Sequence, residues 1–414
     1  MRQRQRLIFL VALLATFVGC KRTPDEPAAS QGATLEVVKE DDAAQVPAAE
    51  PAKKHAYRVD DIHTHLNGAA IPAALTLFDK NGIDRVVNLS GGNQAKNFET
   101  SLLVAQRTHG RVVPYFNIDW SRIDDEGDAF GENIAKDFRA AIAAGYGGLK
   151  LSKGLGLTVT RGDTLLAVDD PLLDPIFEAA GELGVMVSIH TGDPKAFFEP
   201  LDEKNERWLE LSNNPSWSFY GDEYPSREEL LAQRDHLLAK HPKTKFVCVH
   251  FGGNPEDIDA VEKVLDTYPN AYVDIAARLG EIGRHDPKKV RALFIKHSDR
   301  IFFGTDFMMF LGKRGYSVTL GSFSIEPVGP EDVDKFFDAH WRFFETNDAS
   351  MPNPVPIQGD WDLFPIGLPQ DVLEAVYTKN AERLIFGPYD ERTKDLWPEE
   401  EVAPVDAPKD AVPK

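Results

Sequence analysis

The stretch Asp60-Asp61-Ile62-His63-Thr64-His65 determines how the rest of the chain is interpreted. Val59 to Ile62 is typical of the end of a buried strand, and two histidines then follow at positions i and i+2. Residues two apart on a strand point to the same face, so His63 and His65 are expected to project side by side. Two neutral imidazoles on one face can hold one metal ion. A His-x-His pair also arises by chance, so this prediction depends on what the other strands carry.

Downstream of this stretch, short apolar runs alternate with helical patterns. The candidate strands are 57–62, 85–90, 112–118, 146–151, 185–190, 244–250, 271–276 and 300–305. Helices are expected between them, for example over 70–81, 97–108, 133–144, 174–183, 228–240, 257–268 and 287–297. Most strands are continuous apolar runs, which is typical of parallel strands covered on both faces. Eight strand–helix units predict a TIM (β/α)8 barrel. The alternative is a doubly wound open sheet, which would place a glycine-rich phosphate loop where His63-Thr64-His65 stands.

Two connections are much longer than the others. Residues 191–227 follow strand five and are rich in aromatic side chains, and residues 307–360 follow strand eight. Long loops at the carboxyl ends of barrel strands often determine specificity. Simple packing over the barrel rim is the alternative, and the sequence leaves both open.

Composition limits the partners and the domains. The chain has 414 residues and a formal net charge of −20, which argues against nucleic acid and against an anionic membrane surface. Residues 21–56 and 391–414 are polar, proline-containing and without periodicity, so they are expected to form a disordered tether and a disordered acidic tail. The barrel domain is therefore expected over 57–390. Cys248 lies in an apolar run and is expected to be a buried thiol.

The N-terminus is typical of a targeting segment. Arginines precede a short apolar run at 7–18, which is too short to span a bilayer comfortably and fits a signal peptide over residues 1–20. Phe17-Val18-Gly19-Cys20 resembles the bacterial lipobox, which implies lipidation of Cys20 and anchoring to a membrane. Lys21 after the cysteine favours the outer membrane, with the protein facing the periplasm. An ordinary cleaved signal peptide and an uncleaved anchor are the alternatives.

Groups that bind metals or move protons stand at the carboxyl ends of five predicted strands, where TIM-barrel enzymes place their active groups. They are His63 and His65 on strand one, Lys150 on strand four, His190 on strand five, His250 on strand six and Asp306 on strand eight. Each has an ordinary structural explanation. Five independent explanations at the same end of the barrel are much less probable than one shared site.

This pattern resembles the amidohydrolase superfamily of metal-dependent hydrolases over roughly residues 57–390. It is most similar to the branch that includes aminocarboxymuconate-semialdehyde decarboxylase, resorcylate decarboxylases and sugar or pyrone lactonases. Asp169 to Pro175 and Tyr377 to Leu384 are also similar to that branch. The resemblance implies one divalent metal, with the ligands His63, His65, His190 and Asp306. It implies that His250 stands just outside this set and that His250 and Asp306 are the catalytic groups.

Three imidazoles and one carboxylate suit Zn²⁺ with a position left open for water, whose pKa the metal lowers from about 15.7 toward 7. Lys150 leaves a second arrangement open. In binuclear amidohydrolases a carboxylated lysine at this place bridges two metals, and His190 and His250 would then hold the second one. Otherwise Lys150 is expected to bind an anionic substrate, together with Arg278 near the end of strand seven.

The function predicted from these residues is a metal-dependent hydrolase that activates water to cleave an ester, lactone or amide bond of a small molecule, with carboxylates among the expected substrates. A non-oxidative decarboxylase or hydratase using the same metal site is the alternative enzyme, because one fold and one metal site host both chemistries. A non-catalytic binding lipoprotein is the alternative from another class, and it predicts a damaged ligand set.

Overall fold

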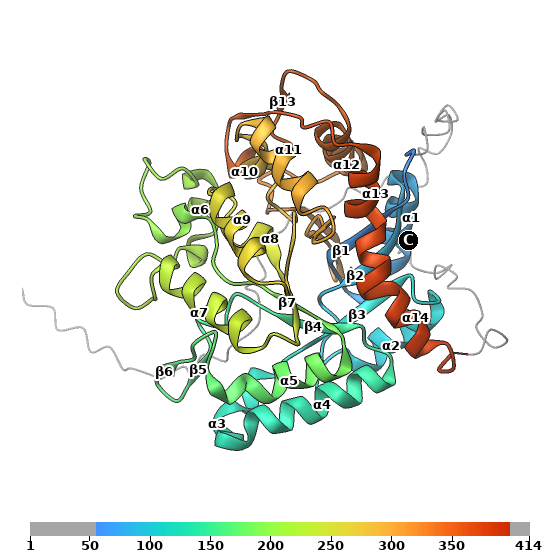
Figure 1. The fold of residues 1–414 in the computed structure, drawn as a ribbon, viewed down its shortest axis with the longest axis vertical. Helices are drawn as coiled ribbons and strands as arrows, with labels where there is room; N and C mark the ends of the chain where they lie inside the picture. Colours follow the sequence, from blue (N-terminus) through green and yellow to red (C-terminus); the bar gives the residue numbers. More distant parts are fainter. Residues whose placement is uncertain (1–54, 398–414) are drawn as a thin grey trace, which may run out of the picture.

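The computed structural model describes residues 55–397, and they form a barrel of parallel strands surrounded by helices (Figure 1). The eight barrel strands are β1 (Val59–Leu66), β2 (Ile83–Asn88), β3 (Val112–Asn117), β4 (Gly148–Leu151), β7 (Met186–Ile189), β8 (Lys245–Cys248), β9 (Ala271–Asp274) and β10 (Ile301–Phe302). Each pairs in parallel with its neighbour in chain order, from β1 through β10. All eight overlap the strands predicted from sequence.

The sheet closes on itself through the segment that contains β10 and β11 (Phe307–Gly312). β10 pairs with β9, whereas β11, which begins four residues after Phe303, pairs in parallel with β1. Between these two pairings, the Ile62 amide donates to the Phe303 carbonyl at 3.1 Å and the Asp306 amide donates to the His63 carbonyl at 2.8 Å. Strand eight therefore lies between strand seven and strand one, and the fold is a TIM barrel, as the sequence predicted.

Helices cover the outer face. They are α1 (Ile71–Asn81), α2 (Phe98–Arg107), α3 (Ile123–Glu126), α4 (Phe130–Ala144), α5 (Asp174–Leu183), α7 (Arg227–Lys240), α9 (Ile258–Thr267) and α11 (Pro287–Lys296). Short 3₁₀ turns lie at 68–70, 120–122, 127–129, 171–173, 195–198, 215–217 and 356–358. Alternate strand residues such as Leu149, Val187 and Phe246 pack outward beneath these helices, which explains the continuous apolar runs.

The inside of the barrel is a separate apolar cluster. Ile62, Val113, Met186, Val247 and Phe302 come from different strands and pack together with the C-terminal helix. That helix runs through α13 (Gln370–Glu374), the π-helical segments η9 (Ala375–Lys379) and η10 (Glu382–Phe386), and α14 (Gly387–Thr393). Because its side chains bond residues at the starts of the strands, it closes the N-terminal end of the barrel. The carboxyl end is left for a functional site.

Both long connections predicted from sequence are present at the carboxyl end. The connection after β7 carries α6 (Trp208–Asn213), and the connection after β10 carries the hairpin of β11 with β12 (Gly315–Leu320) and then α12 (Pro330–Glu345). Two small antiparallel pairs complete the structure, β5 (Thr160–Arg161) with β6 (Thr164–Leu165) and β13 (Met351–Pro352) with β14 (Asp362–Leu363). Shorter helices follow two strands, α8 (Val249–Gly252) and α10 (Leu279–Gly283).

Contacts extend beyond both ends of the expected barrel domain of residues 57–390. His55 was assigned to the tether, yet its ring stacks on Trp341 of α12 with centroids 4.1 Å apart and bonds Glu345 at 2.7 Å. The acidic tail was expected from residue 391, yet α14 continues to Thr393 and Trp397 packs on Tyr389. The expected signal peptide over residues 1–20, the expected lipidation site Cys20 and residues 398–414 lie outside the described residues. Within residues 55–397, no helix is both long enough and apolar enough to cross a lipid bilayer.

Candidate metal centre

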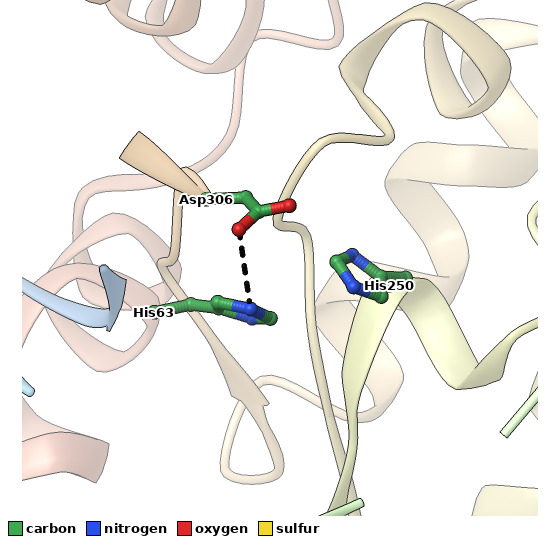
Figure 2. Close-up of side chains that lie close together, drawn as sticks. All are labelled: His63, His250 and Asp306. Carbon is green, nitrogen blue, oxygen red and sulfur yellow. Dashed lines mark ion pairs between the residues drawn. The ribbon is translucent and has the colours of Figure 1, made fainter. Parts of the chain in front are cut away.

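The groups that the sequence placed at the strand ends converge at the carboxyl end of the barrel. His63 and His65 lie on β1 itself, which extends further than predicted, to Leu66. The pairing register between β1 and β2 shifts twice before Thr64, and such irregularities re-aim side chains. His250 and Asp306 occupy the left-handed region, with φ of 58° and 59°, which is uncommon for residues with a side chain and clusters at functional sites. Figure 2 shows these two side chains directed toward His63.

Distances show how closely the imidazoles and the carboxylate approach. Asp306 Oδ1 lies 3.5 Å from His63 Nε2 and 3.4 Å from His65 Nε2. The ring of His250 is centred 4.8 Å from that of His63 and 4.3 Å from that of His190. Ligand atoms of His63, His250 and Asp306 all lie within 4.8 Å of one another. The four histidines and Asp306 therefore form one cluster.

The other ring nitrogen of three histidines is anchored. The carbonyl of Ala276 accepts from His250 Nδ1 at 2.8 Å, and His63 Nδ1 lies 2.7 Å from Asp274 Oδ2. His65 Nδ1 lies 2.7 Å from the hydroxyl of Ser90. A carbonyl can only accept, so the proton of His250 is on Nδ1 and its Nε2 keeps a lone pair; an ionised Asp274 imposes the same tautomer on His63.

Several buried polar atoms in this cluster have no hydrogen-bond partner among the described residues. They are His63 Nε2, Asp306 Oδ1 and Lys150 Nζ. An unpartnered buried polar atom is costly, and a lone-pair nitrogen beside a carboxylate oxygen is the donor set that a divalent metal satisfies. The residues therefore fit the metal that the sequence predicted.

Burial dominates the electrostatics of the cluster. It lowers the pKa of His63, His65 and His250 well below the usual value of 6.5 and that of His190 to about 4, so all four imidazoles are neutral at pH 7. It raises the pKa of Asp306 to about 7. A bound cation would favour the ionised form of Asp306, so metal binding is expected to release a proton from this site.

Asp274 is the residue that the sequence analysis missed. It is fully buried at the end of β9, and besides His63 it accepts from the backbone amides of His250 at 2.7 Å and Ala276 at 3.2 Å. Asp61 lies much closer to His63 in sequence but does not orient its imidazole. Asp61 instead accepts from the amide of His63 at 2.9 Å and the hydroxyl of Thr305 at 2.5 Å, which ties strand one to strand eight. The available signal was a charged residue at the end of the apolar run Tyr272-Val273-Asp274.

Lys150 and Arg278, the two predicted substrate-binding cations, are both buried near the cluster. Burial lowers the pKa of Lys150 to about 8, against the attraction of Asp274 and Asp306. Arg278 Nη2 lies 3.5 Å from Asp193 Oδ1, and its Nε has no partner among the described residues. Two cations with unsatisfied nitrogens facing one site favour an anionic ligand.

Asp193 was not predicted and connects several of these groups. Its carboxylate lies 3.3 Å from His190 Nε2 and 2.8 Å from Lys153 Nζ. Burial alone would raise the pKa of Asp193, but Lys153, His190 and Arg278 together hold it well below its usual range. His190 Nε2 is thus paired with Asp193, while His250 belongs to the close group. The assignment of His190 as a ligand and of His250 outside the ligand set stays a prediction.

A second group of potential ligands lies between α9 and α11 and does not suit a metal. Arg300 donates to His297 Nδ1 at 2.8 Å, so the proton of His297 is on Nε2, which faces Asp266 at 3.3 Å. The ammonium of Lys296 bonds both Asp266 and Glu262 at 2.8 Å. These groups form an ion-pair network.

The chain is similar to known proteins in sequence and in fold. A family model described as amidohydrolase matches residues 125–386, more than half of the chain. A solved TIM-barrel protein of uncharacterised function from Bordetella bronchiseptica is 16% identical, with a TM-score of 0.47, and covers 80% of this chain and 99% of its own. A 2,6-dihydroxybenzoate decarboxylase from Rhizobium is 14% identical, with a TM-score of 0.44 and coverage of 79% and 98%. A 5-carboxyvanillate decarboxylase from Novosphingobium aromaticivorans, complexed with manganese, is 14% identical, with a TM-score of 0.42 and coverage of 75% and 79%. No curated protein matches the chain.

Proposed function

We propose that this chain, which belongs to the amidohydrolase family, is a metal-dependent hydrolase. Its proposed reaction is the cleavage of an ester, lactone or amide bond of a small molecule. The observation that carries the proposal is the pair of unpartnered buried atoms His63 Nε2 and Asp306 Oδ1, 3.5 Å apart at the carboxyl end of the barrel. They are the kind of donors that a hydrolytic metal requires.

One divalent metal, with zinc as the expected ion, would be held by His63, His65, His190 and Asp306, and His250 lies close enough to replace one of them. When bound, the metal supplies Lewis-acid polarisation of a carbonyl oxygen and makes water a nucleophile near pH 7. A bridge of two metals by carboxylated Lys150 remains the alternative, and the count of metals per chain distinguishes them.

The protein's own groups then move protons and hold the substrate. Asp306, once ionised, accepts a proton from the attacking water. The same proton then goes to the leaving group, either directly from Asp306 or through His250, whose Nδ1 proton stays on the Ala276 carbonyl so that its Nε2 can accept the proton from Asp306 and pass it on. Lys150 and Arg278 bind a carboxylate of the substrate and orient it.

The second candidate is a non-oxidative decarboxylase, and the two buried cations are the observation that favours it. The same pair that orients a spectator carboxylate in a hydrolase would hold the reacting carboxylate in a decarboxylase. A non-catalytic binding protein is less well supported, because all the predicted ligands are present and gathered.

The test separates these reactions. Purified zinc-loaded protein is incubated in H₂¹⁸O with a panel of carboxylate-bearing esters, lactones, amides and hydroxylated acids, alongside His63→Ala. Incorporation of ¹⁸O into a cleaved product that His63→Ala does not form is the expected result. Release of CO₂ without ¹⁸O in the organic product would replace the hydrolase with the decarboxylase, and no turnover of any class would favour a binding role.

We also propose that Cys20 is lipidated and that the protein is anchored in the outer membrane facing the periplasm. The support is the N-terminal sequence alone. Mass spectrometry of the mature N-terminus, compared with Cys20→Ser, tests it: diacylglyceryl on Cys20 is expected, and a free thiol or a cleavage site elsewhere would contradict it.

A further inference from the structure

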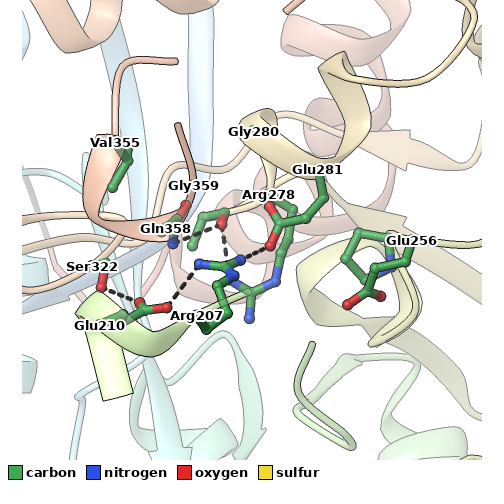
Figure 3. Close-up of polar contacts among 12 residues, drawn as sticks. Arg207, Glu210, Glu256, Arg278, Gly280, Glu281, Ser322, Val355, Gln358 and Gly359 are labelled. Carbon is green, nitrogen blue, oxygen red and sulfur yellow. Dashed lines mark hydrogen bonds and ion pairs between the residues drawn. The ribbon is translucent and has the colours of Figure 1, made fainter. Parts of the chain in front are cut away.

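A fully buried arginine lies behind the mouth of the barrel and joins its long connections. Arg207 precedes α6 in the connection after β7; its Nη1 donates to Glu210 Oε2 at 2.7 Å and its Nη2 to Glu281 of α10. Ser322, in the connection after β12, donates to the other oxygen of Glu210. Figure 3 shows Arg207 between the two carboxylates, with Arg278 beside it. One guanidinium thus links the connections after strands five, seven and eight.

Stability alone is a poor reason for this arrangement. Removing an arginine and two carboxylates from water is costly, and apolar residues of similar size commonly stabilise a protein as well or better. The pairing is also imperfect, because Arg207 Nε and Glu281 Oε2 have no partner among the described residues. Directional ion pairs instead fix the geometry of the groups they join.

The group whose geometry is fixed is Arg278. It immediately precedes α10 as the N-cap residue, and Glu281 is three residues further, in the first turn of that helix. The preceding residue, Ala277, has a φ of 56° and is therefore strained. The Ala277 carbonyl accepts from Arg278 Nη1 at 2.8 Å and from Gln358 Nε2 at 3.3 Å. Arg207 holds Glu281 on one side of Arg278, and Gln358 holds Ala277 on the other. These two contacts determine where the guanidinium of Arg278 lies.

We propose that Arg207 is a positioning residue for substrate recognition: through Glu281 it holds the first turn of α10, so that Arg278 presents its guanidinium to a substrate carboxylate. This inference rests on the proposed function only in that Arg278 binds the carboxylate. It adds that recognition depends on a residue that does not contact the substrate.

The experiment measures discrimination by charge. Benzoate and its neutral isostere benzamide are the probes, and their dissociation constants for the zinc-loaded full chain are measured by ligand-observed NMR. Wild type is expected to prefer benzoate, and Arg278→Met to lose that preference. Arg207→Met is expected to reduce the ratio of the two constants at least threefold, with Arg207→Lys recovering part of it because an ammonium can still pair with Glu281.

The matched control is Arg85→Met. Arg85 is also a largely buried arginine, paired with Asp390 at 2.7 Å, but it lies at the opposite end of the barrel. The Arg85→Met substitution should lower the melting temperature and leave the preference for benzoate over benzamide unchanged. A purely structural role for Arg207 predicts the same behaviour for Arg207→Met, and that result would overturn the proposal.

Two further results distinguish failure of this inference from failure of carboxylate recognition by Arg278. If Arg207→Met does not fold, Glu281→Gln replaces it, because it weakens the same link with a smaller change in side-chain shape, and an unchanged ratio there overturns the proposal. If wild type shows no preference for benzoate and Arg278→Met changes nothing, carboxylate recognition by Arg278 fails, and this inference fails with it. If Arg278→Met loses the benzoate preference but Arg207→Met and Glu281→Gln keep it, the positioning role of Arg207 is rejected and carboxylate binding by Arg278 stands.

Discussion

Asp274→Asn is the substitution whose effect the geometry specifies most closely. Oδ1 of Asp274 accepts from two backbone amides, those of His250 and Ala276, at 2.7 and 3.2 Å. An asparagine must place its oxygen there, so its amino group takes the position of Oδ2, 2.7 Å from His63 Nδ1. A donor at that point forces the proton of His63 onto Nε2, the atom that faces Asp306.

A protonated Nε2 cannot bind a metal. Loss of an outer partner of a metal-bound histidine typically costs tenfold to a hundredfold in affinity, and the enforced wrong tautomer places this case near the upper end, at about 2.8 kcal/mol. The assay is zinc titration of metal-free protein against a competing chelator, with circular dichroism to confirm folding. The control is Asp60→Asn, which changes an equally buried aspartate that lies on the strand of His63 but outside the cluster, and it should leave zinc affinity unchanged. A folded Asp274→Asn protein that binds zinc within threefold of wild type would refute the tautomer reasoning.

Three further predictions concern stability and local order. Burial raises the pKa of Asp60 from 3.8 to about 7, so between these pH values the unfolded chain loses a proton that the folded chain keeps, and the free energy of unfolding should fall as pH rises from 4 to 7. In urea unfolding, Asp60→Asn should be more stable than wild type by up to roughly 4 kcal/mol at pH 8 and equally stable near pH 4. Equal stability of the two proteins at both pH values would contradict this prediction. Lys150→Met removes a buried ammonium without a partner and should stabilise the metal-free protein by roughly 1–4 kcal/mol while metal content stays constant; a drop in metal content would instead indicate a bridging lysine. Lys153 Nζ lies 5.1 to 5.5 Å from the ring centroids of Phe197, Trp217 and Phe219. Lys153→Met removes these contacts and should speed amide hydrogen exchange in residues 197–219 about tenfold. Exchange as slow as in wild type would show that other contacts hold this loop.

The barrel could be predicted because its signals are local. Each strand is a short apolar run covered on both faces, and most connections return through an amphipathic helix, so most units are visible in a window of about 30 residues. Closure was not visible in the same way. It depends on Gly304-Thr305-Asp306 interrupting strand eight, so that β10 completes one pairing and β11 begins another.

The candidate site was predictable in its members and less so in their relations. His63, His65, His190, His250 and Asp306 could be gathered because parallel strands end at one edge. Which nitrogen each imidazole presents depends on contacts between residues far apart in sequence: Asp274 lies 211 positions from His63. Asp193 and Arg207 lie within the long connection after strand five, and loops carry no periodicity from which a position could be derived.

The central claim is that the carboxyl end of this barrel holds a divalent metal, and metal content per chain tests it most directly. The full chain is purified without chelators, loaded with zinc, desalted and measured by elemental analysis beside His63→Ala and Lys150→Ala. A ratio near one, lost in His63→Ala and kept in Lys150→Ala, is the predicted result. A ratio near two that falls in Lys150→Ala would replace the single-metal site with a bridged pair. A ratio near zero in wild type, or one unchanged by His63→Ala, would contradict the claim.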